Sequence, residues 1–236
     1  MITVAYSTKK IREQYIEDIK NSSNLELEII TVQNNNFLSL TEFYNKAISL
    51  SKNEIIVLCH DDLIFETYNW TQKIINHFNN NSSCGIIGVA GTKHLSKSGV
   101  WWEHCNPMYG IVNHIVDGKK QECRWSHETK YLEDMVVVDG LFLAIHKKRI
   151  KNYFDESIKG FHYYDLDFCL SNFLNNVKIG LCTDVRLTHF STGSVNASWE
   201  ENKKVFVEKY NKHLPVDIRK NKIELFPSMG PFCPDK

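Results

Sequence analysis

The sequence of 236 residues lacks the features of a membrane or secreted protein. No apolar run approaches the roughly 20 residues that a bilayer-spanning helix needs. The first residues contain no basic stretch followed by an apolar segment of signal-peptide length. We therefore expect a cytoplasmic protein without a transmembrane segment.

An excess of one charge is also missing, because 28 lysine and arginine side chains balance 28 aspartate and glutamate side chains. A dedicated nucleic-acid binder normally has a basic excess. No nucleic-acid partner is expected from this composition.

Cysteine pairs and the common nucleotide motifs are absent too. The seven cysteines include no C-x-x-C pair, which predicts reduced thiols rather than a disulfide framework. No Walker loop or G-x-S-x-G elbow occurs, and Gly85, Gly88 and Gly91 have the wrong spacing for a dinucleotide fingerprint. The central histidines and cysteines fit no common structural-zinc spacing: His94, His104, Cys105, His114, Cys123 and His127.

The first part of the chain has a regular alternation of strand and helix signals. Strands are predicted at residues 2–6, 27–32, 55–59 and 85–89, and helices at 11–21, 40–51 and 70–79. Thr41 is the predicted N-cap of the second helix. This alternation predicts an α/β fold with a mostly parallel sheet and helices on both faces.

The pattern weakens over residues 92–133, which are rich in glycine, histidine, tryptophan and charge. We expect an irregular segment with a functional role, because Trp101, Trp102 and Trp125 argue against disorder. Strand signals return at 136–145, 177–182 and 185–190, and helix signals at 165–175 and 200–210.

Residues 215–236 are basic and punctuated by proline, which is typical of a tail. A solvated tail is the favoured interpretation. Contact with a membrane surface is the alternative, through the basic cluster from Arg219 to Lys222 with Phe226 and Phe232.

The strongest chemical signal is His60-Asp61-Asp62, directly after the apolar run at 55–59. Carboxylates at the end of a buried strand lie in the crevice where open α/β sheets bind ligands. Mg²⁺ and Mn²⁺ take such oxygen ligands. An acidic helix N-cap explains the same pair equally well.

Two further signals lie late in the chain. Asp165 and Asp167 stand in the first turn of a predicted helix, where the helix dipole favours acids and where a general base is also possible. His189 follows a short apolar strand and precedes Ser191-Thr192-Gly193. This histidine is interpreted as a metal or phosphate contact, with a purely structural role as the alternative.

In order and spacing these segments resemble the GT-A glycosyltransferases, specifically the glycosyltransferase family two-like group, over roughly residues 1–195. The resemblance is carried by the segments 44–48, 55–62, 85–91, 99–102, 138–144 and 164–167, and by His189. It implies a single GT-A domain at 1–214, with a nucleotide-sugar-binding half at 1–91 and an acceptor-side half at 92–214, followed by a tail at 215–236.

The same resemblance implies a metal-dependent, inverting transfer from a nucleotide-diphosphate sugar, with UDP as the expected nucleotide and Mn²⁺ or Mg²⁺ as the cation. The acceptor would be a hydroxyl of a glycan, free or linked to lipid or protein. Asp62 and His189 would bind the metal, and Asp165 would be the general base. Donor-binding roles fall on Ser7, Asn34, Asp61, Asp139, Gly140 and Trp102.

The sequence departs from the family pattern at three places. His60 replaces the first acid of the D-x-D motif, Gln33 or Asn34 replaces the base-reading acid, and Tyr164 replaces a glutamate. Three alternatives remain: a retaining transferase, a non-catalytic carbohydrate- or partner-binding domain, and a sugar-nucleotide pyrophosphorylase. The segment 7–12 lacks the glycines that the last class has after its first strand.

Overall fold

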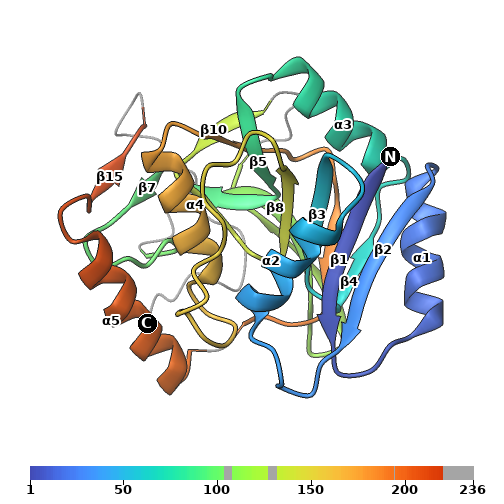
Figure 1. Cartoon of the computed structure of the whole chain (residues 1–236), viewed down its shortest axis with the longest axis horizontal. Coiled ribbons are helices and arrows are strands. Elements are labelled where there is room, and N and C mark those ends of the chain that lie inside the picture. The colour runs from blue at the N-terminus through green and yellow to red at the C-terminus, as the bar shows by residue number, and fades with distance from the viewer. Residues whose placement is uncertain (104–107, 127–131, 194, 220–236) are drawn as a thin grey trace.

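A seven-stranded sheet lies at the centre of the protein, in the order β10-β13-β5-β12-β3-β1-β2 (Figure 1). The computed structural model describes residues 1–103, 108–126, 132–193 and 195–219. The strands of this sheet are β1 (Ile2–Thr8), β2 (Leu27–Gln33), β3 (Ile55–Cys59), β5 (Cys84–Gly88), β10 (Glu133–Met135), β12 (Phe142–His146) and β13 (Lys178–Leu181).

The described helices are α1 (Glu13–Ser23), α2 (Leu40–Leu50), α3 (Trp70–Asn80), α4 (Tyr164–Leu174) and α5 (Ala197–Tyr210). α2 and α4 lie in front of the sheet in Figure 1, and α1 contacts α3. The predicted α/β architecture is confirmed. No helix within the described ranges is both long and apolar enough to cross a membrane.

Five strands of the central sheet, β1, β2, β3, β5 and β13, run in one direction, as the sequence predicts, and two run against them. β1 pairs in parallel with β2 and β3, and β13 with β5. β12, however, is antiparallel to both β3 and β5, and β10 is antiparallel to β13. Because β12 enters the sheet without a crossover helix, nothing constrains it to the parallel direction.

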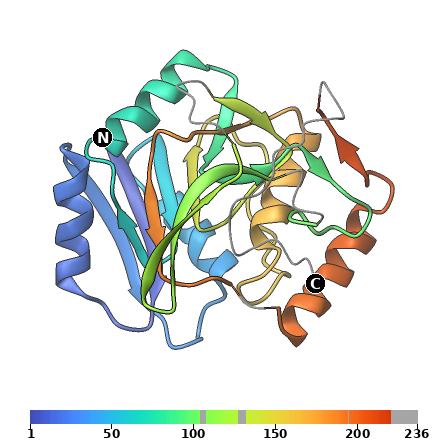
Figure 2. The same ribbon diagram turned by 180° about the vertical axis from the view of Figure 1, so that it is seen from behind.

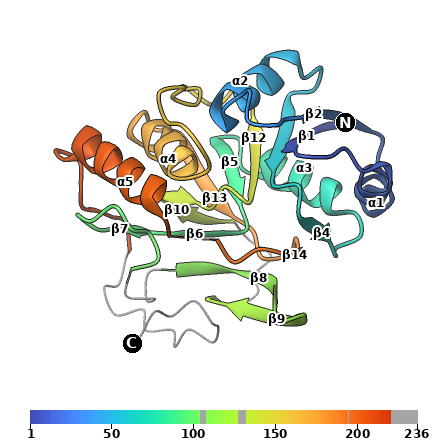
Figure 3. The ribbon, with the colours of Figure 1, turned by 90° about the horizontal axis from the view of Figure 1, so that it is seen from below.

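The expectation of an irregular segment at 92–133 is wrong for residues 108–124, which form the largest part of a second sheet. This sheet has the order β11-β6-β8-β14-β4, with β9 paired to β8. Its strands are β4 (Leu63–Phe65), β6 (Ala90–Thr92), β8 (Met108–Val116), β9 (Lys119–Arg124), β11 (Val137–Val138) and β14 (Leu187–His189). Seen from behind, the β8–β9 hairpin stands in front of the central sheet (Figure 2), and it lies on the side away from α2 (Figure 3).

The hairpin has a sequence signal that the periodicity analysis missed. Asp117 and Gly118 form a two-residue turn with φ angles of 50° and 72°. An Asp-Gly pair with positive φ at both positions is the preferred chemistry of a tight hairpin turn.

Two smaller predictions need correction. The N-cap of α2 is Ser39 rather than Thr41, because Ser39 and Glu42 form a reciprocal capping box. The predicted tail is partly ordered, since β15 (Val216–Asp217) pairs with β7 (His94–Leu95). Arg219 binds Asp217, and the rest of the basic cluster, with Phe226 and Phe232, lies outside the described residues.

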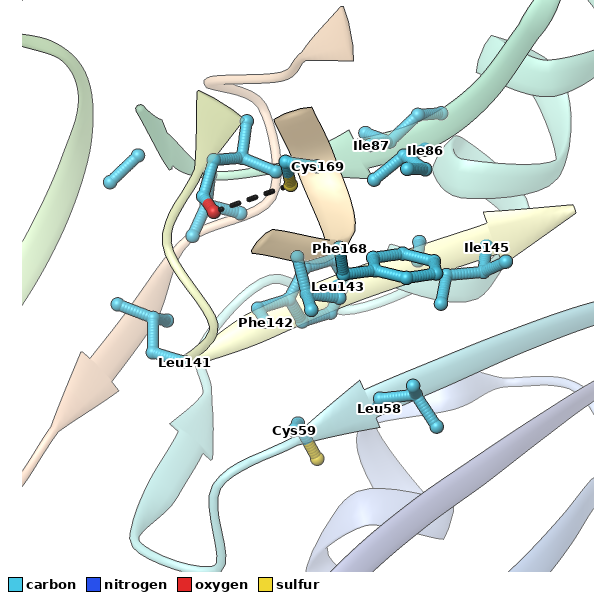
Figure 4. Close-up of a cluster of buried hydrophobic side chains, with 14 of the residues drawn as sticks. Leu58, Cys59, Ile86, Ile87, Leu141, Phe142, Leu143, Ile145, Phe168 and Cys169 are labelled. Atoms are coloured by element: carbon cyan, nitrogen blue, oxygen red, sulfur yellow. Dashed lines mark hydrogen bonds between the residues drawn. The ribbon is translucent and has the colours of Figure 1, made fainter. Parts of the chain in front are cut away.

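The core lies between the central sheet and α4 (Figure 4). β3 is buried along its whole length, as its apolar run predicts. Phe168 of α4 stacks on Phe154 at a centroid distance of 4.1 Å. This packing sets the N-terminus of α4 beside the end of β3, where the chemical signals lie.

Candidate functional site

A cavity of about 1110 Å³ opens at the carboxyl ends of β1, β3 and β14. Most of the predicted site residues line it: Ser7, Asp61, Asp62, Trp102, Asp139, Asp165 and His189. Asn34 and Gly140 are not part of this lining. The fold therefore brings the three separate chemical signals of the sequence into one site.

The backbone of the His60-Asp61-Asp62 segment is held on three sides. His60 N donates to the carbonyl of Leu141 at 3.1 Å, and Tyr15 Oη donates to the carbonyl of His60 at 3.1 Å. Phe190 N donates to the carbonyl of Asp62 at 3.1 Å, which ties the segment to the residue after β14. The segment after β3 therefore lies beside the end of β14, which brings Asp62 close to His189.

Three side chains form a candidate metal group: His60, Asp62 and His189, whose ligand atoms all lie within 4.8 Å of one another. His189 Nε2 lies 3.2 Å from Asp62 Oδ1, 3.3 Å from His60 Nδ1 and 2.9 Å from Ser191 Oγ. The sequence interpretation missed His60 as a third candidate ligand, although its place directly before Asp61 and Asp62 is the signal.

The protonation of this group suits a cation. Burial raises the pKa of Asp62, but the hydrogen bond and charge of His189 outweigh burial and hold the pKa at about 2. Burial and the neighbouring His189 lower the pKa of His60. An ionised carboxylate and a neutral imidazole are the forms that bind metal. The chemistry of these donors therefore fits a divalent cation.

Asp61 is turned toward β1. Its Oδ2 accepts a hydrogen bond from Thr8 Oγ1 at 2.5 Å, and the guanidinium of Arg12 donates to its carbonyl oxygen. Ser7 and Lys9 line the same part of the cavity. This end of the site therefore combines hydroxyl, carboxylate and cationic groups.

Asn34 makes a set of local contacts. Its Nδ2 donates to Ser7 Oγ at 3.2 Å and to the carbonyl of Leu38 at 2.9 Å, and its Oδ1 accepts from the backbone N–H groups of Phe37 and Leu38. The amide holds the loop between β2 and α2, so its place in a donor pocket stays a prediction.

Asp165 stands in the first turn of α4 and is 8% exposed. Its Oδ2 accepts a hydrogen bond from Gly140 N at 2.8 Å. Burial and the nearby Asp139 raise the pKa of Asp165 to about 7. A carboxylate with that pKa can accept a proton at neutral pH.

Gly140 supports the site although it does not line the cavity. A Cβ atom at this position would lie 2.1 Å from Tyr164 Oη and 2.9 Å from Asp165 Cβ. Only glycine lets the loop between β11 and β12 approach α4 this closely.

The second acid of α4 has a different environment. Asp167 is 1% exposed, and its Oδ1 lies 2.7 Å from Lys209 Nζ and accepts from Tyr210 Oη at 2.9 Å. These contacts join α4 to α5. Of the two predicted acids, only Asp165 lines the main cavity.

Aromatic side chains form part of the wall of the cavity. Trp199 lies 5.7 Å from Trp102 and 5.5 Å from Tyr163, between ring centroids. Trp101, Trp125 and Phe161 also line the cavity. The sequence prediction did not single out Trp199, which lies just before the predicted helix at 200–210 and in the first turn of α5 (Ala197–Tyr210) in the structure.

An α/β fold with a large central sheet and five described helices, and a cavity at the carboxyl ends of β1 and β3, is consistent with the GT-A class of sugar-transferring folds. The chain belongs to the glycosyltransferase like family, whose model matches residues 1–210. Membership makes glycosyl transfer its general function.

No curated protein matches the sequence. Among solved structures, the crystal structure of A197 from STIV is similar, with 10% sequence identity and a TM-score of 0.47. The match covers 81% of this chain and 86% of that chain.

Proposed function

We propose that the protein transfers a sugar from a nucleotide-diphosphate donor to an acceptor hydroxyl, with inversion and with a divalent cation. The observation that carries this proposal is the single cavity that holds both the His60, Asp62 and His189 group and Asp165. The group of His60, Asp62 and His189 suits a cation that binds the leaving diphosphate, and Asp165 suits the attacking hydroxyl. UDP is the expected nucleotide, on the strength of the family resemblance.

The donor set favours Mn²⁺ over Mg²⁺. Mg²⁺ prefers oxygen ligands and retains several waters, whereas imidazole suits transition metals. Two of the three candidate ligands here are histidines. When bound, the cation would supply Lewis-acid stabilisation of the diphosphate leaving group.

Asp165 is the proposed general base. Gly140 N donates to its Oδ2, which orients the carboxylate in the wall of the cavity. Removal of the hydroxyl proton to Asp165 would accompany direct attack on the anomeric carbon. Direct attack breaks the bond to the diphosphate from the opposite side, so the product has inverted configuration.

The aromatic wall supports a carbohydrate acceptor. Trp102 is partly exposed in the cavity wall and packs on Trp199, so its ring is held in place to stack on the C–H face of a sugar. Tyr163 is two residues from Asp165, so an acceptor on this wall would lie next to the base. Trp102 is therefore proposed for the acceptor rather than the donor.

The first experiment is a donor screen by calorimetry with UDP-, GDP-, CMP- and dTDP-sugars, each with Mn²⁺ and with EDTA. We expect one nucleotide class to bind only with Mn²⁺. Asp62→Ala should remove that metal-dependent affinity, because it deletes the charged ligand, whereas Asp165→Asn should retain donor binding and lose transfer.

Two results would contradict the proposal. Binding that is equal in Mn²⁺ and EDTA would remove the metal role, and transfer by Asp165→Asn at the wild-type rate would remove the base. The anomeric configuration of the product, read by NMR, distinguishes inversion from retention.

A further inference from the structure

A second group of metal-ligating side chains lies outside the main cavity. The ligand atoms of His77, Cys182 and Asp184 all lie within 4.8 Å of one another, and these residues are not part of the cavity lining. His77 belongs to the last turn of α3, whereas Cys182 and Asp184 belong to the connection between β13 and β14. That connection passes beside α3 in Figures 1 and 2. We call these three residues the second ligand group.

The contacts of Asp184 divide its two oxygens between two partners. Oδ1 lies 2.9 Å from His77 Nε2, and Oδ2 lies 3.3 Å from Lys73 Nζ. A cation bound at Oδ1 would replace the hydrogen bond between His77 and Asp184 and leave the contact with Lys73 intact. The side chain of Lys73 is 38% exposed, so water screens its charge from such a cation.

Both elements that carry the second ligand group are held by hydrogen bonds. Cys182 N donates to the carbonyl of Gly88 at 3.0 Å, and Asn81 Nδ2 donates to the carbonyl of His77 at 2.9 Å. Cys182 and His77 are also buried. Ligands on fixed elements keep their geometry better than ligands on free loops. The fold therefore keeps the three donors together, although His77 and Asp184 are 107 residues apart in sequence.

The donors of the second ligand group suit Zn²⁺. Thiolate and imidazole select transition metals, and Zn²⁺ takes cysteine, histidine and aspartate ligands. Bonds of about 2.0–2.3 Å place tetrahedral ligand atoms about 3–4 Å apart, so a spacing within 4.8 Å closes with small side-chain rotations. One thiolate and one carboxylate balance the charge of a divalent cation, which avoids the cost of a buried net charge.

We propose that His77, Cys182 and Asp184 form a second metal site, which binds Zn²⁺ and links α3 to the connection between β13 and β14. The thiol proton of Cys182 passes to solvent on binding, because the thiolate is the ligand. The side chain of Asp184 is 18% exposed, so water can reach the fourth coordination position. The inference is independent of the proposed function, because its ligands lie outside the candidate active site.

The test uses Co²⁺ as a coloured substitute for Zn²⁺, because a thiolate ligand gives Co²⁺ a charge-transfer band in the near ultraviolet. The full chain, stripped of metal with EDTA, should develop this band on titration with Co²⁺ and lose it when Zn²⁺ is added. The group of His60, Asp62 and His189 contains no thiolate, so Co²⁺ bound there gives no such band. The band should therefore persist in Asp62→Ala.

Two variants test the ligands of the second site. Cys182→Ser removes the thiolate and should abolish the band. His77→Gln keeps a side-chain N–H for Asp184 but removes the imidazole, so it retains the ion-pair geometry without the ligand. We expect it to weaken Co²⁺ binding about tenfold or more, since even the loss of an outer contact of a metal ligand has that effect.

Cys84→Ser is the matched control. Cys84 is a buried cysteine of the neighbouring strand β5 and does not belong to the second ligand group. This variant should keep the band at the wild-type Co²⁺ affinity. Circular dichroism melts check that each variant folds, and if Cys182→Ser does not fold, His77→Gln decides the outcome.

The outcomes are distinct from those of the proposed function. A wild-type protein without the band, a band retained by Cys182→Ser, or wild-type Co²⁺ affinity in His77→Gln would overturn the second metal site. His77 and Asp184 would then form a structural ion pair beside a buried thiol. Neither donor binding nor sugar transfer enters this measurement, so its failure leaves the proposed function intact.

Discussion

At the scale of single residues, the ionised carboxylate of Asp165 lowers the stability of the folded protein. The carboxyl is buried beside Asp139, and both effects raise its pKa to about 7. Between the ordinary pKa of an aspartate, about 4, and this value, the folded protein binds more protons than the unfolded chain. The contribution of Asp165 to stability therefore becomes less favourable as pH rises through that window.

Asp165→Asn should remove this penalty while keeping an oxygen for the N–H of Gly140. We expect the variant to be more stable than the wild type at pH 8 by up to about 4 kcal/mol, and the difference to shrink toward pH 4. Urea unfolding at the two pH values measures it. Equal stability of the variant and the wild type at pH 8 would contradict the raised pKa of the Asp165 carboxyl.

Sugar transfer by the wild type should rise with pH through about 7, because the carboxyl of Asp165 must be ionised to act as a base.

At the scale of elements, the loop between β11 and β12 sets the position of α4. Gly140 N binds Asp165, and the space a Cβ would need is filled by Tyr164 Oη at 2.1 Å and Cζ at 2.6 Å. Because Tyr164 is itself buried and bonded to His60, it has no free direction in which to move.

Gly140→Ala should therefore displace Tyr164 and Asp165 together. We expect a loss of about 1–3 kcal/mol in the free energy of unfolding, typical of overpacking, and a large loss of transfer from a residue that does not line the cavity. Gly180→Ala is the control, because its Cβ would meet the flexible side chain of Leu132 at 3.1 Å. Similar losses of stability and transfer in both variants would contradict the inference that the close contact of Gly140 with Tyr164 and Asp165 requires glycine.

At the scale of the whole molecule, the two predicted halves share one sheet. β12 lies between β3 and β5, and β13 pairs with β5, so strands from both sides of residue 91 alternate. Neither half can complete the central core by itself, since β3 would lose its neighbour along one edge.

We expect the chain to unfold in one cooperative transition. Trp70 reports on the first half, and Trp101, Trp102, Trp125 and Trp199 report on the second. Unfolding curves from tryptophan fluorescence and far-ultraviolet circular dichroism should coincide. A fragment of residues 1–91 should show no cooperative transition, and a stable fold of that fragment would contradict the shared sheet.

Local chemistry explains what the sequence predicted well. The α/β alternation, the buried strand before Asp62 and the helix after Tyr163 follow from the spacing of apolar residues, which acts within a few residues. The same local patterns identified Asp62, Asp165 and His189, because acids and histidines at strand and helix ends are visible in sequence. The Asp117-Gly118 turn was equally visible and shows that the hairpin was predictable.

The sequence by itself determined the class of fold and singled out the candidate site residues, since both depend on residue type and short-range periodicity. Only the tertiary structure decided the antiparallel entry of β12, the contacts of Asp167 with Lys209 and Tyr210, and the contact of His60 with Tyr164. His60 and Tyr164 are 104 residues apart in sequence. Burial, pKa and hydrogen-bond direction depend on such distant neighbours, and no local pattern encodes them.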